Sequence, residues 1–145
     1  MRIAVVGATG NAGTAVLREL ARRDTVEAIL GIARRLPDEQ SQPYNYAAWQ
    51  SVDIQFSASR AELAELFTGY DAVIHLAWLI QPNTKRELLR KVNVDGTRYV
   101  LEAAAQAGVK TVVVASSVGP IPPSTTMHCE MSPGPQGVSS ARITA

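Results

Sequence analysis

The 145-residue sequence has one cysteine, Cys129, which excludes an internal disulfide framework and a cysteine-rich metal site, so we expect no metal. It has no excess of charge: 14 Lys and Arg face 13 Asp and Glu, giving a net charge of +1. No strong basic field therefore points to nucleic acid or to an anionic membrane as a partner. The longest apolar stretch, residues 72–80, is far shorter than the roughly 18 residues that indicate a membrane span.

The N-terminus enters a strand-like run at residue 3, without a signal-peptide cleavage region, so we expect a cytoplasmic location. Hydrophobic residues make up 46% of the chain and charged residues 19%, which is typical of a globular protein.

Short apolar runs alternate with helical patterns through the first 117 residues. Strands that are apolar throughout need helices on both faces of a sheet, and repeated β-α units give right-handed parallel crossovers. The sequence thus predicts an α/β fold, a Rossmann-type doubly wound parallel sheet of about five strands ordered 3-2-1-4-5. The expected strands are residues 3–6, 28–33, 52–54, 72–76 and 111–115.

Three helices are expected between these strands. The first covers residues 11–23. Ser59 and Glu62 match a capping box, which predicts that Ser59 caps the second helix, and Gly69 would end it in the left-handed conformation. The third helix would end at Gly108.

The C-terminal residues break the pattern. Residues 120–145 hold five of the eight prolines, with many Ser and Thr and few charges. We therefore expect residues 1–119 to form the Rossmann-type domain and residues 120–145 an irregular tail.

The segment from Gly7 to Gly13 is the most informative, because three glycines spaced three apart separate a strand from a helix. Gly7 would leave the strand, Gly10 would admit a diphosphate against the backbone, and Gly13 would let helix and strand pack closely. Amides at the helix N-terminus would then bind the phosphates. A glycine-rich turn shaped only by packing is the alternative. The cofactor-binding candidates in this segment are Gly7, Thr9, Gly10, Asn11 and Gly13.

Arg34 and Arg35 follow the second strand, where an acidic residue would bind the ribose 2′-hydroxyl of NAD. A guanidinium there can instead bind the 2′-phosphate of NADP in a bidentate manner. This favours NADP as the cofactor, with NAD as second choice; a solvated pair of arginines is the alternative.

Five motifs follow one another along the chain: the three glycines, Asp53-Ile54, His75-Leu76-Ala77-Trp78, Asn93-Val94-Asp95-Gly96-Thr97 and Ser116-Ser117. Together they resemble the extended short-chain dehydrogenase/reductase family, in its NAD(P)-dependent epimerase/dehydratase branch, and the resemblance covers residues 2–119. It implies hydride transfer between NAD(P)(H) and a carbinol or carbonyl carbon.

The resemblance also implies individual roles. Asp53 would contact the adenine amine, with Ile54 beside it, although Asp53 could instead cap a turn. Leu76 and Ala77 would line the path of the nicotinamide ribose. Asn93 would support a local kink and a water, and Ser117, with Ser116 as alternative, would polarise the substrate oxygen. His75 is expected to be a packed histidine without a catalytic role, and Gly96 a packing notch.

The family's catalytic Tyr-x-x-x-Lys occurs nowhere in the sequence: none of the four tyrosines has a lysine four residues later. The resemblance fades at Pro120, so we expect a truncation or a frame change there, an incomplete active site and exposed apolar surface that promotes self-association. The alternatives are a non-catalytic NADP(H)-binding or redox-sensing module and a non-binding remnant that does not fold stably. The expected partners are an unidentified small-molecule substrate and, as in family dimers, a second copy of the chain.

Overall fold

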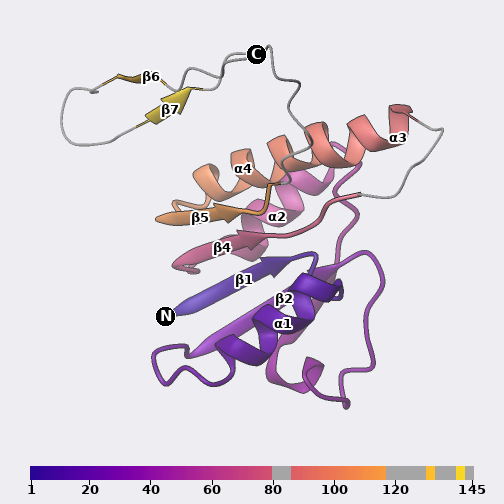
Figure 1. The fold of residues 1–145 in the computed structure, drawn as a ribbon, viewed down its shortest axis with the longest axis vertical. Helices are drawn as coiled ribbons and strands as arrows, with labels where there is room; N and C mark the ends of the chain where they lie inside the picture. Colours follow the sequence, from indigo (N-terminus) through magenta and orange to yellow (C-terminus); the bar gives the residue numbers. More distant parts are fainter. Residues whose placement is uncertain (80–85, 117–129, 133–139, 143–145) are drawn as a thin grey trace, which may run out of the picture. The chain divides into compact units, whose positions relative to one another are not determined.

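The computed structural model of the chain describes residues 1–79, 86–116, 130–132 and 140–142 (Figure 1). The chain divides into two compact units, Met1–Ala115 and Ser116–Ala145. Among the described residues, no helix has the length and apolar character needed to cross a membrane.

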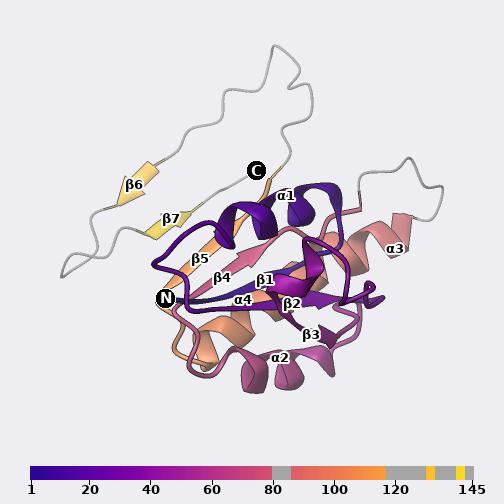
Figure 2. The same cartoon turned by 90° about the horizontal axis from the view of Figure 1, so that it is seen from below.

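The first unit contains a parallel sheet of five strands ordered β3-β2-β1-β4-β5, which confirms the predicted fold class (Figures 1 and 2). In this register Val6 at the end of β1 lies opposite Ile32 on one side and His75 on the other. The carboxyl ends of the three central strands therefore meet at one edge of the sheet. The strands are β1 (Arg2–Val6), β2 (Ala28–Ala33), β3 (Ala48–Ser51), β4 (Ala72–His75) and β5 (Thr111–Val114).

Helices cover both faces of the sheet, as the continuously apolar strands require (Figure 2). On one face, Leu17 of α1 (Asn11–Leu20) packs against Ile3 and Val5 of β1. The other face packs against α2 (Ser59–Phe67) and α4 (Thr97–Gln106). Two further helices, α3 (Arg86–Arg90) and the π-helical segment η2 (Lys91–Gly96), precede α4, and a short 3₁₀ helix, η1 (Tyr44–Tyr46), precedes β3.

The predicted position of the third strand is wrong. Residues 48–51 form β3, pairing with Leu30–Ala33, whereas residues 52–54 follow it. Val52 and Ile54 are both buried, at 5% and 6% exposure, so their apolar alternation reflects core packing in the connection after the strand. As a consequence, Asp53 lies beyond the carboxyl end of β3.

The capping role predicted for Ser59 is also wrong, because α2 begins at Ser59 and Ala58 occupies the N-cap position. Turn hydrogen bonds join the Ser59 amide to the Phe56 carbonyl and the Arg60 amide to the Ser57 carbonyl. These bonds satisfy amides that a side-chain cap would otherwise serve. The predicted left-handed helix stop at Gly69 is confirmed by its φ of 79°. Gly108, where the third helix was expected to end, has a φ of 71°.

The second unit contains two short antiparallel strands, β6 (Glu130–Ser132) and β7 (Ser140–Arg142). These six residues have regular pairing within the stretch that we expected to be irregular. Three-residue strands give too little periodicity for a sequence pattern to indicate them.

Candidate cofactor site

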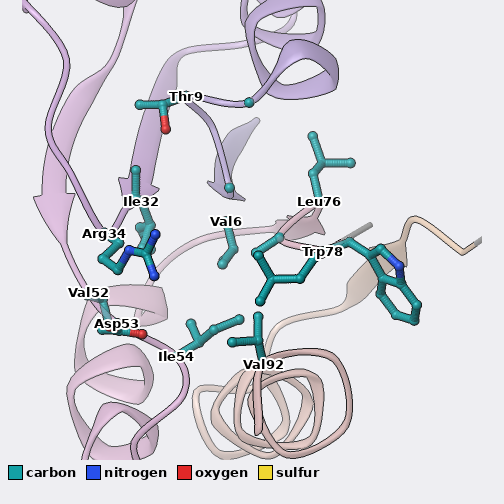
Figure 3. A pocket seen from close by; sticks show the side chains of 15 residues that line it. Val6, Thr9, Ile32, Arg34, Val52, Asp53, Ile54, Leu76, Trp78 and Val92 are labelled. Carbon is teal, nitrogen blue, oxygen red and sulfur yellow. The ribbon is translucent and has the colours of Figure 1, made fainter. Parts of the chain in front are cut away.

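A pocket of about 330 Å³ opens at the carboxyl ends of β1, β2 and β4. Strand order reverses between β1 and β4, and open α/β sheets bind their ligands at such a switch point. Figure 3 shows side chains from several strands and loops converging on this space. The pocket is lined by Val6, Gly7, Thr9, Gly10, Ile32, Ala33, Arg34, Val52, Asp53, Ile54, Leu76, Ala77, Trp78, Leu79 and Val92.

The three glycines of the loop after β1 have different physical reasons for lacking a side chain. Gly7 has a φ of 86°, and a Cβ there would lie 2.6 Å from the Ala77 amide nitrogen. At Gly13 a Cβ would lie 2.5 Å from the Gly7 carbonyl oxygen, so the close approach of α1 to the loop requires glycine. At Gly10 the nearest atom to a Cβ would be that same oxygen, at 3.4 Å, which is ordinary contact. The packing of the chain therefore does not require a glycine at position 10.

Helix α1 begins with its N-terminus unprotected by side chains. Gly10 is the N-cap, and no side-chain hydrogen bond caps the helix within the described residues. The first turn contains no acidic residue, so the partial positive charge of the helix end is not neutralised there. A bare loop residue at a free helix end fits a diphosphate group. Asn11 is exposed and Gly13 buried, and neither lines the pocket.

Arg34 and Asp53 lie together at one end of the pocket, after β2 and β3 (Figure 3). Arg34 is exposed and lines the pocket, whereas Arg35 does not. The Gln55 amide donates to Asp53 Oδ1 at 3.2 Å, and Gln55 Nε2 donates to Asp53 Oδ2 at 2.5 Å. Asp53 therefore stabilises a turn, as the alternative interpretation of this residue expected. Its side chain also faces the pocket, and its contact with adenine stays a prediction.

The segment after β4 forms the opposite wall and is fixed at both ends. The Leu76 amide donates to the Val6 carbonyl at 2.8 Å. Asn93, in η2, accepts from the Leu79 amide at 2.9 Å and donates to the Leu79 carbonyl at 3.1 Å. Both polar atoms of the Asn93 side chain are thus engaged with backbone. This geometry gives Asn93 a positioning role, and its catalytic role stays a prediction.

His75, at the end of β4, is 1% exposed and does not line the pocket. Its Nε2 lies 2.9 Å from Thr97 Oγ1, whereas Nδ1 has no hydrogen-bond partner among the described residues. Burial lowers the pKa of His75 to about 4, so the ring is neutral at pH 7. The structure thus shows the packed, hydrogen-bonded histidine that the sequence predicts.

Gly96 is a packing notch, as expected, because a Cβ there would lie 2.9 Å from the side chain of Ile54. Ser117, the predicted substrate-polarising residue, lies outside the described residues, and its alternative, Ser116, is exposed.

Several pocket residues were missed by sequence reasoning, and all of them are largely apolar. An apolar residue that ends a strand has the same sequence signal as one in the core. The rule that ligands bind beyond the carboxyl ends of parallel strands could have found those on β1 and β2. The missed residues are Val6, Ile32, Ala33, Val52, Leu79 and Val92, together with the side chain of Trp78.

The chain is similar to parts of several longer, known enzymes. L-arabinose 1-dehydrogenase (NAD(P)(+)) of Haloferax volcanii is 35% identical over 118 residues, which are 80% of this chain and 41% of that protein. Cinnamoyl-CoA reductase 1 of Oryza sativa subsp. japonica is 32% identical over 125 residues, covering 82% of this chain and 35% of that protein.

The solved structure of MoeE5 in complex with UDP-glucuronic acid and NAD is 30% identical, with a TM-score of 0.65, and the match covers 81% of this chain and 37% of that one. This chain thus spans less than half the length of each of these three proteins. The family model described as NAD dependent epimerase/dehydratase matches residues 3–139. The chain therefore belongs to the NAD dependent epimerase/dehydratase family.

Proposed function

We propose that this chain binds NADP(H) and forms the dinucleotide-binding part of an oxidoreductase acting at a carbinol or carbonyl carbon. The observation that carries the proposal is Gly10, whose missing side chain serves no packing need yet leaves the backbone bare at the free N-terminus of α1. Backbone amides at a helix start bind phosphate well, and the adjoining pocket lies at the switch point of the sheet.

Different residues along the pocket would bind successive parts of the cofactor. The loop from Gly7 to Gly10 would bind the diphosphate. Arg34 and Asp53 would take the adenosine half, and Leu76 and Ala77 the nicotinamide half. When bound, the nicotinamide ring would supply or accept the hydride.

Charge favours NADP over NAD. A guanidinium at Arg34 can donate two hydrogen bonds to a 2′-phosphate, and hydrogen bonds to charged groups contribute about 1.5–3 kcal/mol. Of the two charged side chains at this end of the pocket, Arg34 is the cation, so it is the one that can neutralise a phosphate.

Arg34→Met, with Arg35→Met as the matched control, tests the proposal. Isothermal titration of the 145-residue chain should show NADPH binding that weakens by about tenfold or more in Arg34→Met, with NADH binding unchanged. Arg35→Met should bind both like the parent, because Arg35 lies outside the pocket. Absence of dinucleotide binding by the parent would refute the function, and equal loss in both variants would refute the role of Arg34.

We further propose that the chain is catalytically incomplete, with Ser117 as the residue that would polarise a substrate oxygen. The sequence has no Tyr-x-x-x-Lys, the pair that the family resemblance requires for proton transfer. Turnover at an ordinary enzyme rate, about 1–10³ per second, would contradict this proposal.

The same missing pair favours a second candidate, a module that binds NADP(H) and reports redox state without chemistry. A module of this kind should bind NADPH and NADP⁺ with clearly different affinities while oxidising no cofactor in the presence of carbonyl compounds. Equal affinity for the two redox forms would count against it.

A further inference from the structure

Trp78 is an exposed tryptophan at the pocket. Its side chain is 39% exposed, whereas the other tryptophan, Trp49, is 7% exposed and donates from Nε1 to the Tyr44 carbonyl at 2.8 Å. Trp49 thus has a clear structural role in the core. The exposure of Trp78 leaves a large aromatic surface available beside a ligand site.

The backbone that carries Trp78 is held on both sides. Leu76 is tied to Val6 of β1, and Leu79 is tied by two hydrogen bonds to Asn93. Trp78 therefore stands on a segment with a fixed path, which is what a residue that orients a ligand needs. Figure 3 shows its indole and the Arg34 guanidinium on opposite sides of the pocket.

The side chains that line the pocket are charged at one end and apolar at the other. Arg34 and Asp53 provide charge at one end, whereas the side chains that neighbour Trp78 along the wall are those of Leu76, Ala77 and Leu79. A hydroxyl-rich ligand group would find no hydrogen-bond partner among the side chains of Leu76, Ala77 and Leu79. A flat apolar ring would instead gain stacking on the indole face.

We propose that Trp78 is a specificity-determining residue that selects carbonyl or carbinol compounds carrying an aromatic ring. The proposal rests on the proposed function, because it places the ring beyond the nicotinamide end of the cofactor pocket. It names a substrate class for that site: aryl-substituted ketones, aldehydes or alcohols rather than free sugars.

Ligand-observed and protein-observed NMR titrations of the 145-residue chain test this directly, with and without NADPH. The probes are 4-phenyl-2-butanone, its saturated analogue 4-cyclohexyl-2-butanone, and D-glucuronate. Binding of the aryl ketone should exceed that of the other two probes and should weaken by about threefold to tenfold in Trp78→Ala, but stay within about twofold in Trp78→Phe. In the parent, the Trp78 indole N–H resonance should shift with the aryl ketone while that of buried Trp49 does not.

The outcomes separate the two proposals. If NADPH binds but the aryl ketone binds no better than its saturated analogue, or equally well in Trp78→Ala, the role of Trp78 is refuted and the proposed function stands. Stronger binding of D-glucuronate than of the ketone also refutes it. If NADPH does not bind, the proposed function fails, and the indole titration without NADPH still decides whether Trp78 receives an aromatic ring. Circular dichroism of both variants checks that the fold is unchanged.

Discussion

Alanine at Gly10 and at Gly13 should produce opposite defects, although both glycines belong to one motif. At Gly13 an added Cβ would lie 2.5 Å from the Gly7 carbonyl oxygen and 2.6 Å from the carbonyl carbon and oxygen of Ala8. All three contacts are with backbone, so α1 must shift away from the loop. Overpacking of this kind costs about 1–3 kcal/mol of folding stability.

At Gly10 the same methyl group meets nothing closer than 3.4 Å, and the residue has φ −73° and ψ 168°, which alanine adopts readily. Alanine restricts the unfolded chain, which stabilises by about 0.4–1 kcal/mol, whereas it is a poorer N-cap than glycine. These effects oppose each other, so stability should change by less than about 0.5 kcal/mol. The methyl group would, however, occupy the space assigned to the diphosphate, and NADPH should bind about tenfold more weakly or worse.

Urea unfolding followed by circular dichroism, paired with NADPH titration, measures both quantities on the same proteins. Gly13→Ala should unfold at lower urea, and Gly10→Ala should unfold like the parent but bind poorly. A Gly10→Ala protein that binds NADPH within about twofold of the parent would refute the assignment of the diphosphate to this loop. Normal stability of Gly13→Ala would refute the packing argument.

Two further predictions concern residues around the β4 segment. The folded-state pKa of His75, about 4, lies below its unfolded value of 6.5, so the unfolded chain binds the proton first as the pH falls. Lowering the pH from 7 to 4.5 should reduce the free energy of unfolding of the parent by about 2 kcal/mol more than that of His75→Gln. An equal reduction in the two proteins would contradict the buried neutral ring. Asn93→Ala should weaken NADPH binding, because it releases Leu79 from both hydrogen bonds. Asn93→Asp keeps the acceptor but not the donor, so its NADPH affinity should lie between those of the parent and Asn93→Ala. Full affinity in Asn93→Ala would refute the positioning role.

Four of the five strands could be located from sequence because each is a continuous apolar run. The exception is instructive: β3 is an edge strand in which Trp49 is the one buried residue, so it has no apolar run to detect. The buried pair that follows it, Val52 and Ile54, imitates the alternation of a strand. Local periodicity reports burial, and here the buried pair lies after the strand rather than within it.

The site was predictable to the extent that its residues have unusual local requirements. Backbone contacts leave no room for a Cβ at positions 7 and 13, so these positions require glycine. An arginine after β2 could be identified because a phosphate-binding residue is expected there when the cofactor is NADP. The two-sided contact of Asn93 with Leu79 was not predictable, because η2 continues a helical pattern without a break in the sequence. An extra residue in a helical turn has no compositional signature, although such turns often mark functional sites.

The residues that we propose for cofactor binding and for chemistry lie in different stretches of this chain, which makes the binding proposal testable without a reaction. Among the described residues that line the pocket, all but Val92 lie within the first 79 residues, because each of the first four strands ends at the same edge of the sheet. Ser117 follows the fifth strand, beyond the described residues. A substitution at Gly10 or Arg34 should therefore change NADPH affinity even in a chain that turns nothing over, so loss of binding and loss of catalysis can be measured as separate events.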